Sequence, residues 1–198
     1  HERALRWLAE DGPYESLEAV LCVVAATLFF TSAYYSRAAM VGSTGENAPS
    51  HGPNRRWRPA WLTALGVMLL AMACAELSLG QRLFGFATPE WLRQRNYQGE
   101  FSFHNLLVFQ SNDEGNRLQN LFLLGLLFYV GLLPIASRVW RKVGDVVARV
   151  ELPLASVPLA LVFLAYLVMY VTLTPYSSET LELAFDVLLV ALAVEAMW

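Results

Sequence analysis

The chain has 198 residues, of which 56% are hydrophobic and only 16% are charged, and its formal net charge at pH 7 is −3. Soluble domains carry about 45–50% apolar residues, so this composition excludes an ordinary soluble domain. The basic residues are scattered and lack interleaved aromatic residues, which excludes a nucleic-acid-binding surface.

The apolar residues are collected into five blocks, separated by segments that hold most of the charges and prolines. Blocks of about 20 such residues match the roughly 30 Å thickness of membrane hydrocarbon at 1.5 Å rise per residue. We therefore predict an all-α, polytopic membrane helical bundle that forms a single integral membrane domain over residues 1–198. The predicted transmembrane segments are 17–37, 59–80, 118–137, 152–174 and 182–198.

The first two predicted helices flank a polar link. The first begins after the breaker pair Gly12-Pro13, with Ser16 as its expected N-terminal cap. The second begins behind Pro59. The link at 38–58 mixes Gly, Pro, Ser and Asn and cannot bury enough apolar surface to order itself, so we predict a flexible loop.

Prolines divide the later part of the chain. Pro153 falls in the first turn of the fourth helix, where proline is tolerated, whereas Pro158 lies deeper and predicts a kink. Pro175 ends this helix, and the fifth helix is expected to begin around 179–183.

The alternating directions of five helices sort the links onto two faces. One face receives the 38–58 and 138–151 links, and the other receives the N-terminus and the 80–117 link. Eight of the fourteen Lys and Arg residues fall on the first face and cluster close to helix ends. The positive-inside rule therefore places the first face in the cytoplasm, with the N-terminus and the 80–117 link extracytoplasmic.

Acidic residues from distant parts of the chain are expected to gather at the outer face. Glu179, Glu182 and Asp186 are spaced i, i+3, i+7 and form one stripe on the last helix. The start of the first helix brings Glu15 and Glu18 to the same face. Ionised carboxylates packed there would repel one another without cationic partners. We therefore predict a secondary acidic layer of Glu15, Glu18, Glu182 and Asp186.

Glu76 lies close to the outer end of the second predicted helix. It shares a face with Ala73 and Gly80, small residues that let another helix approach, so its carboxylate is expected to point into the bundle. Such an acid handles a proton or binds a ligand. The alternative is a structural role, as a backbone cap or in an ion pair with Arg82.

The polar 80–117 link is expected to be ordered. "PEWLRQR" predicts a short interfacial helix with Pro89 at its first position. The stretch 101–109 is too short to cross a membrane and predicts an interfacial or re-entrant piece that places His104 and Asn105 against the bundle. His104 is either a hydrogen-bonded packing residue or a ligand.

This part of the chain carries a resemblance to a known family. "AELSLGQRLFG", "TPEWL", "NYQGE" and "HNL", with "EDGPYES" upstream, resemble a family of uncharacterised bacterial multi-pass membrane proteins. The family pattern is E-x-S-x-G-Q-R-x-x-G, then T-P-E, N-x-Q-x-E and H-N-L, and Leu79 stands where that pattern usually has an aromatic residue. The resemblance implies a bacterial cytoplasmic membrane location and no established activity. It also implies a candidate polar site of Glu76, Ser78, Gln81, Arg82, Asn96, Gln98, Glu100, His104 and Asn105.

The sequence lacks the motifs of several kinds of catalytic and cofactor-binding site. The histidines, His1, His51 and His104, all lie outside the predicted helices, which argues against a His-ligated metal, haem or chlorophyll. Phosphate-binding loops, G-x-S-x-G elbows and H-E-x-x-H helices are absent from the sequence. Cys22 and Cys74 lack CxxC spacing and are expected to be buried free thiols. We therefore assign no catalytic residue, no metal and no cofactor, and expect only bound lipids.

Two functions from different classes remain. The favoured one is a non-catalytic membrane subunit or scaffold of a larger bacterial assembly, such as an accessory chain of a photosynthetic or respiratory complex without histidine-ligated pigment. Its partners would be the lipid bilayer and other membrane protein chains. The alternative is a membrane-embedded enzyme, or a protein that binds a small ligand or cation, with an outer-face site around Glu76, Arg82 and His104.

Overall fold

The described part of the chain is mostly helical, with short irregular connections and one short strand pair. The computed structural model describes residues 13–42, 56–77, 84–95, 110–111, 115–173 and 178–198. Its helical segments are α2 (Pro13–Gly42), α3 (Arg58–Glu76), α5 (Glu90–Arg93), α6 (Arg117–Leu126), η2 (Leu127–Leu132), α7 (Leu133–Val139), α8 (Arg141–Val150), α9 (Val157–Leu173) and α10 (Ser178–Glu195). The strands β1 (Gln110–Ser111) and β2 (Gly115–Asn116) pair antiparallel.

Three helices in the described ranges are long and apolar enough to cross a membrane. They span Ser16–Val41, Arg58–Ala75 and Leu121–Val139. The apolar part of α9, Val157–Met169, is shorter, and α10 carries four acidic residues along its length. The architecture is therefore an all-helical one with three candidate membrane-spanning helices, which is consistent with a membrane location.

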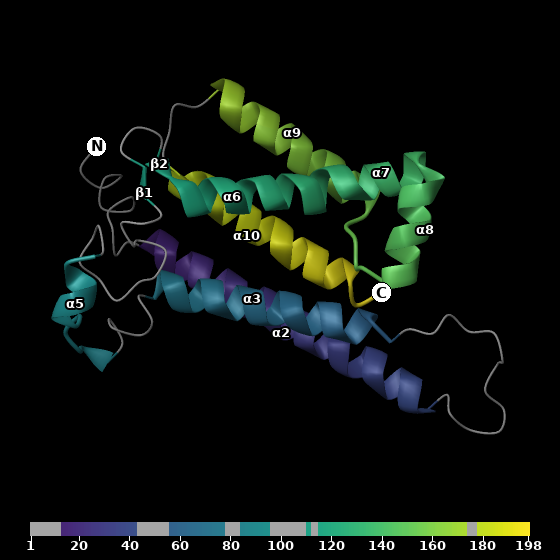
Figure 1. The fold of residues 1–198 in the computed structure, drawn as a ribbon, viewed down its shortest axis with the longest axis horizontal. Coiled ribbons are helices and arrows are strands. Elements are labelled where there is room, and N and C mark those ends of the chain that lie inside the picture. Colours follow the sequence, from purple (N-terminus) through teal and green to yellow (C-terminus); the bar gives the residue numbers. More distant parts are fainter. Residues whose placement is uncertain (1–12, 43–55, 78–83, 96–109, 112–114, 174–177) are drawn as a thin grey trace.

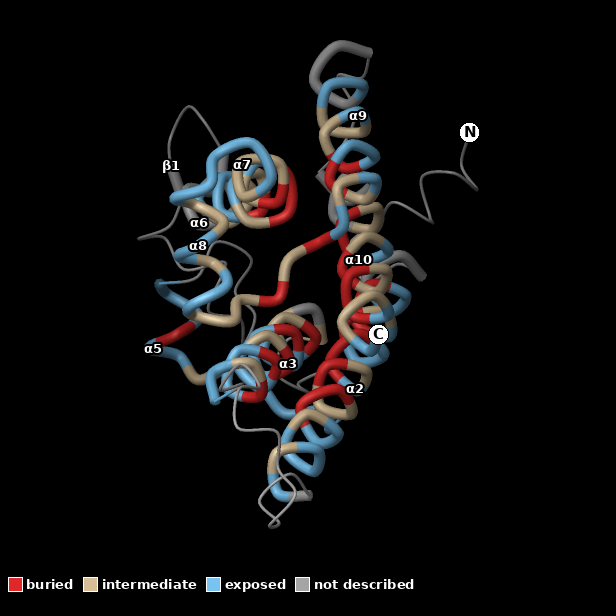
Figure 2. The backbone as a smooth tube through the Cα atoms, turned by 90° about the vertical axis from the view of Figure 1, so that its right-hand side faces the viewer, coloured by how far each residue is buried: buried red, intermediate tan, exposed pale blue. Residues whose placement is uncertain are grey.

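The tightest packing joins α2, α3 and α10. The buried face of α2 carries mostly small residues, namely Ala19, Cys22, Ala25, Ala26 and Ala33. Small side chains at helical spacing allow neighbouring backbones to approach closely. On α3, Gly66 provides the same closeness, because a Cβ added there would lie 2.8 Å from the ring of Phe30. The buried residues of the three helices face one another in Figure 2.

The helix from Arg117 to Val139 is continuous but changes its winding before Pro134. The backbone N–H of Leu133 donates to the carbonyl of Phe128, five residues back, in the π-helical segment η2. Proline lacks an N–H, and its ring collides with the carbonyl four residues earlier in a regular α-helix. The wider π turn relieves that collision, so Pro134 remains inside the helix. Next to it, Gly131 lets Leu164 of α9 approach, since an added Cβ would lie 2.8 Å from its side chain.

A sharp corner separates α7 from α8. Trp140 adopts an extended conformation between the two helices, and α8 then runs across the direction of the long helices (Figure 1). A Cβ added to Gly144 would lie 2.6 Å from the carbonyl oxygen of Ser137, so the corner requires glycine there. At the other end of α8, Glu151 has φ 54 and ψ 33, the left-handed conformation that often ends a helix.

Several local predictions are wrong. Ser16 lies inside α2 and does not cap it, because the described helix already begins at Pro13. The fourth predicted helix begins at Val157, so Pro158 falls in the first turn, where proline is tolerated without a kink. Cys22 is buried as expected, but Cys74 is exposed.

Candidate functional site

A buried polar cluster lies between α2 and α10. It consists of Glu18 and Cys22 on α2 and Asp186 on α10, with exposed fractions of 2%, 1% and 5%. Glu18 and Cys22 are four residues apart, so they lie one turn apart on the same face of α2. The cluster thus brings two acidic side chains into the interface of two helices that are far apart in the sequence.

One hydrogen bond crosses this interface. The Cys22 Sγ donates to Asp186 Oδ1 at 3.4 Å. The buried neighbours Ala19, Phe185 and Leu189 make the surroundings apolar. Ionised carboxylates in such surroundings cost several kcal/mol each unless they are paired or hydrogen-bonded. An arrangement of this kind can therefore bind a proton or join two helices through hydrogen bonds.

A second polar network lies at the other end of the bundle, away from the Glu18–Cys22–Asp186 cluster. Glu151 Oε2 accepts from the backbone N–H groups of Trp57 and Arg58 at 2.9 and 3.0 Å. These N–H groups lie at the start of α3, where they have no partner within the helix and where a negative charge is favourable. The Arg58 Nη2 donates to the carbonyl of Ala196 at 3.1 Å. Residues on α3, after α8 and after α10 are thereby held together.

Glu195 makes the third connection at this end. Its carboxylate accepts from the backbone N–H of Ser156 at 2.7 Å and from the Ser156 hydroxyl at 2.5 Å. The hydroxyl oxygen in turn accepts from the N–H of Leu159 at 3.3 Å, which caps the start of α9. The Tyr129 hydroxyl donates to the carbonyl of Pro153. The segment between α8 and α9 is thus fixed to both α10 and η2.

A hollow of about 440 Å³ lies beside these contacts. Its lining residues are Pro134, Ser137, Arg138, Leu154, Ala155, Ser156, Val157, Glu195 and Trp198. Apolar side chains form most of the wall, while Arg138 is exposed. The mostly apolar wall is compatible with an apolar group such as part of a lipid molecule.

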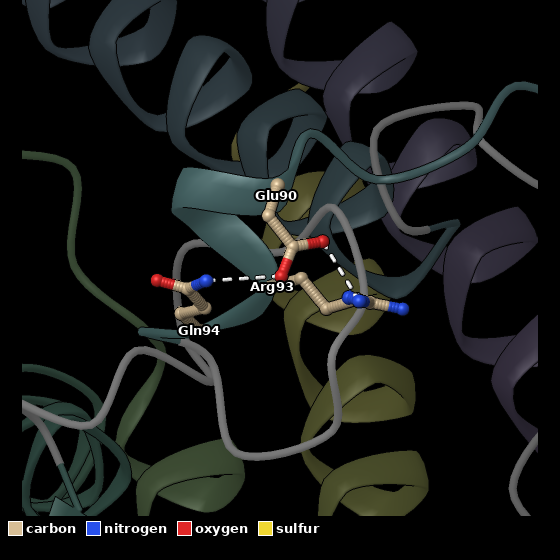
Figure 3. Close-up of polar contacts among 3 residues, drawn as sticks. All are labelled: Glu90, Arg93 and Gln94. Atoms are coloured by element: carbon tan, nitrogen blue, oxygen red, sulfur yellow. Dashed lines mark hydrogen bonds and ion pairs between the residues drawn. The ribbon is translucent and has the colours of Figure 1, made fainter.

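The short helix α5 carries an ion pair between two of its own side chains. Glu90 Oε2 lies 2.7 Å from the Arg93 Nη2, and Glu90 Oε1 accepts from the Gln94 Nε2 at 3.0 Å (Figure 3). The hydrogen bond from Gln94, followed by that from Arg93, holds the pKa of the Glu90 carboxyl below its ordinary value. Leu92 on the same helix is buried. These contacts stabilise α5 and carry no sign of catalysis.

Most of the predicted polar site lies outside the described residues. Eight of its nine members are not described, namely Ser78, Gln81, Arg82, Asn96, Gln98, Glu100, His104 and Asn105. Glu76 is the last residue of α3, and its backbone alone is described. In the secondary acidic layer, the side chains of Glu15 and Glu182 are likewise outside the described part. The two remaining members, Glu18 and Asp186, both lie in the α2–α10 cluster.

Sequence reasoning missed the residues that complete both networks. The prediction of a buried free thiol gives Cys22 no polar partner, although its spacing of four residues from Glu18 places the two on one helix face. Glu151 lies in the predicted 138–151 link and Glu195 lies near the end of the last predicted helix, and neither position by itself indicates a contact. No local pattern identifies their partners, because the chain separations are 94 and 39 residues.

Neither a metal-binding group among the described residues nor a known relative identifies the chemistry of these sites. Within the described ranges, no group of three or more His, Cys, Asp or Glu side chains is placed to hold a metal ion. Comparison of the chain with family models, curated proteins and solved structures finds no significant match.

Proposed function

We propose that this chain is a non-catalytic integral membrane subunit that assembles with other membrane protein chains. The observation that carries the proposal is the use of its polar side chains. Glu151, Glu195 and Arg58 each contact a different segment of the chain. Hydrogen bonds to charged groups are worth about 1.5–3 kcal/mol each. These residues therefore stabilise the arrangement of the helices, and their polar groups are engaged in contacts within the chain.

The apolar exterior supports the same proposal. One exposed stripe runs along α6, η2 and α7, and its members are Leu121, Leu124, Phe128, Leu132 and Val139. The candidate spanning helix that carries this stripe has only 22% of its apolar window buried inside the chain. Lipid covers such a surface, and so do the helices of a partner chain.

The finer topology belongs to the same proposal. We infer five membrane crossings, with α9 and α10 as the fourth and fifth, in a bacterial cytoplasmic membrane. The N-terminus and the 80–117 link would lie on the extracytoplasmic side, because the basic residues cluster at the opposite helix ends. The resemblance of residues 75–105 to a bacterial membrane protein family supports the location and brings no activity with it.

Isolation in mild detergent tests the proposal. A subunit is expected to migrate in a larger assembly with fixed stoichiometry to another membrane chain. A photoreactive residue at Leu124, on the exposed stripe, is expected to cross-link to that chain. The matched control at Asp145, on the charged face of α8, is expected to give no such product. A protein that runs as a monomer and cross-links only to lipid would overturn the proposal.

The Glu18–Cys22–Asp186 cluster favours one alternative, a membrane protein that handles a proton or small ligand. Its two acids lie in an apolar interface, and such acids mark proton or ligand pathways more often than surface ones do. This alternative includes the outer-face residues Glu76, Arg82 and His104 that the sequence predicts, of which Arg82 and His104 lie outside the described residues. Glu18→Gln and Asp186→Asn variants that assemble normally but lose proton uptake in reconstituted vesicles would support it.

A further inference from the structure

The helix α8 has two chemically distinct faces. Its apolar residues recur at i, i+3, i+4 and i+7, and they are Val143, Val146, Val147 and Val150. Its charged residues occupy the other side, and they are Arg141, Lys142, Asp145 and Arg149. The charged side chains are all exposed, and the charged face has a net positive charge. A basic amphipathic helix of this kind is typical of helices that lie in a membrane surface.

The position of α8 in the fold agrees with this role. The helix runs across the ends of the long helices, so it lies parallel to a membrane that those helices cross (Figure 1). Four of the six tryptophans are exposed at this end of the molecule, namely Trp57, Trp61, Trp140 and Trp198. Trp61 contacts α8 directly, since its Nε1 donates to the carbonyl of Val150 at 2.9 Å. Tryptophan is enriched where hydrocarbon meets the headgroups.

The partial burial of the apolar stripe indicates which way α8 faces. Val143, Val147 and Val150 are half-buried, whereas Val146 on the same stripe is 56% exposed. The stripe therefore turns towards the bundle, which is the hydrocarbon side, and its uncovered part is available to acyl chains. The basic residues point the opposite way, towards headgroups and water.

We propose that α8 is an in-plane interfacial helix that selects anionic phospholipids in one leaflet, with Arg141, Lys142 and Arg149 as the residues that bind the headgroups. Arg138 extends the basic surface to the hollow beside α7, whose apolar wall fits an acyl chain. Each Lys or Arg near an anionic membrane surface strengthens binding about fivefold. The occupant is a membrane phospholipid, because the exposed Val146 lies on the apolar face of α8, next to the charged face, and a soluble anion would leave this apolar side chain uncovered.

Native mass spectrometry of protein released from nanodiscs tests the selectivity. The nanodiscs contain a minority of phosphatidylglycerol in phosphatidylcholine, and the readout is the share of phosphatidylglycerol among retained lipids. Wild type is expected to retain it several-fold above its bulk share. The Arg141→Gln, Lys142→Gln, Arg149→Gln triple variant is expected to fall to the bulk share, whereas Arg93→Gln with Arg95→Gln, at the other end, leaves retention unchanged.

Two results of this measurement would overturn the proposal. One is equal enrichment in wild type and the triple variant. The other is loss of the enrichment on addition of millimolar inorganic phosphate, which would identify a site for free anions and no lipid site. Raising the salt concentration is expected to weaken the enrichment, because exposed charges are screened.

Depth measurement tests the orientation of α8 independently of lipid selectivity. A spin label at Val146, in a Cys74→Ala background, is expected to be accessible to oxygen and protected from a water-soluble nickel reagent. A label at Asp145 is expected to show the reverse. The buried Cys22 serves as the unlabelled control. Equal access of the nickel reagent to both labels would place α8 in water and overturn the proposal.

Discussion

Substitution of Glu151 tests the connection between the α8–α9 link and the start of α3. Its carboxylate accepts from two backbone N–H groups, those of Trp57 and Arg58. A capping side chain is worth about 0.5–2 kcal/mol, and a negative charge at a helix start adds about 0.3–1 kcal/mol. Glu151→Ala is therefore expected to lower the free energy of unfolding by about 1–3 kcal/mol.

The backbone of Glu151 gives this prediction a second component. Its φ of 54 lies in the left-handed region, which costs a residue with a Cβ about 1–2 kcal/mol. Glycine adopts that region freely. Glu151→Gly therefore loses the cap but relieves the strain, so it is expected to be about 1 kcal/mol less harmful than Glu151→Ala. Glu151→Gln keeps an acceptor oxygen and loses only the charge, at a cost of about 0.3–1 kcal/mol.

Two measurements check these values. Reversible unfolding in mixed micelles, followed by circular dichroism, gives the order of stability among the three variants. Hydrogen exchange at the amides of Trp57 and Arg58 reports the cap directly, and exchange is expected to accelerate in both Glu151→Ala and Glu151→Gly, because both variants lose the carboxylate that accepts from these amides. Equal stability of the Ala and Gly variants would refute the argument from backbone strain. Unchanged exchange in both would refute the capping role.

Three further predictions concern other contacts. Gly144→Ala is expected to destabilise the α7–α8 corner by about 1–3 kcal/mol, since its Cβ meets a backbone carbonyl, and limited proteolysis at the corner checks this. Gly66→Ala is expected to cost a similar amount, and adding Phe30→Ala should recover part of the loss in a double-mutant cycle of unfolding. The Glu90 carboxyl is expected to titrate below its ordinary pKa by NMR, and Gln94→Ala should raise that pKa. Because the pKa is lowered in the folded chain, the contribution to α5 is present at neutral pH and lost as the pH falls through it.

The class of architecture could be predicted from the sequence because its signal is local. A run of about twenty apolar residues predicts a spanning helix without knowledge of any partner. Three of the five predicted segments correspond to helices long and apolar enough to cross a membrane. The bounds were less accurate, since α2 extends to Gly42, five residues beyond the apolar run that identified it. Arg37 does not end the helix, because Ala38, Ala39 and Met40, which follow it, are good helix formers.

The helix α8 could have been predicted but was not. The Lys and Arg count of residues 138–151 predicts the side of the membrane on which this link lies, and it carries no information on secondary structure. The spacing of Val143, Val146, Val147 and Val150 already gave the period of an amphipathic helix. A short helix between two spans is overlooked when hydropathy is averaged over long windows, because the mean hydropathy of such a helix is low. The helix is identified by the spacing of its apolar residues.

The π-helical turn and the long-range caps could not have been predicted in this way. Pro134 predicts that the regular α-helix is interrupted near this residue. A kink, a break and a π turn all relieve the collision between the proline ring and the carbonyl four residues earlier. Which of them forms depends on packing against α9, which local sequence does not show. The cap on α3 comes from Glu151, 93 residues beyond Arg58. No sequence pattern near Arg58 indicates that its backbone N–H donates to the side chain of Glu151.

The acidic residues at the two ends of the bundle make different contacts. This difference helps to distinguish a non-catalytic subunit from a membrane protein that handles a proton or small ligand. At the α8 end, Glu151 and Glu195 accept hydrogen bonds from backbone groups, so their loss should change stability in either function. In the α2–α10 interface, Asp186 is buried and accepts a hydrogen bond from the thiol of Cys22 on the neighbouring helix. An acid buried in an apolar interface costs stability unless its hydrogen bonds offset the loss of hydration. A neutral Asp186→Asn variant that is as stable as wild type would indicate that the acid is retained for chemistry, whereas a destabilised one would assign it to helix packing.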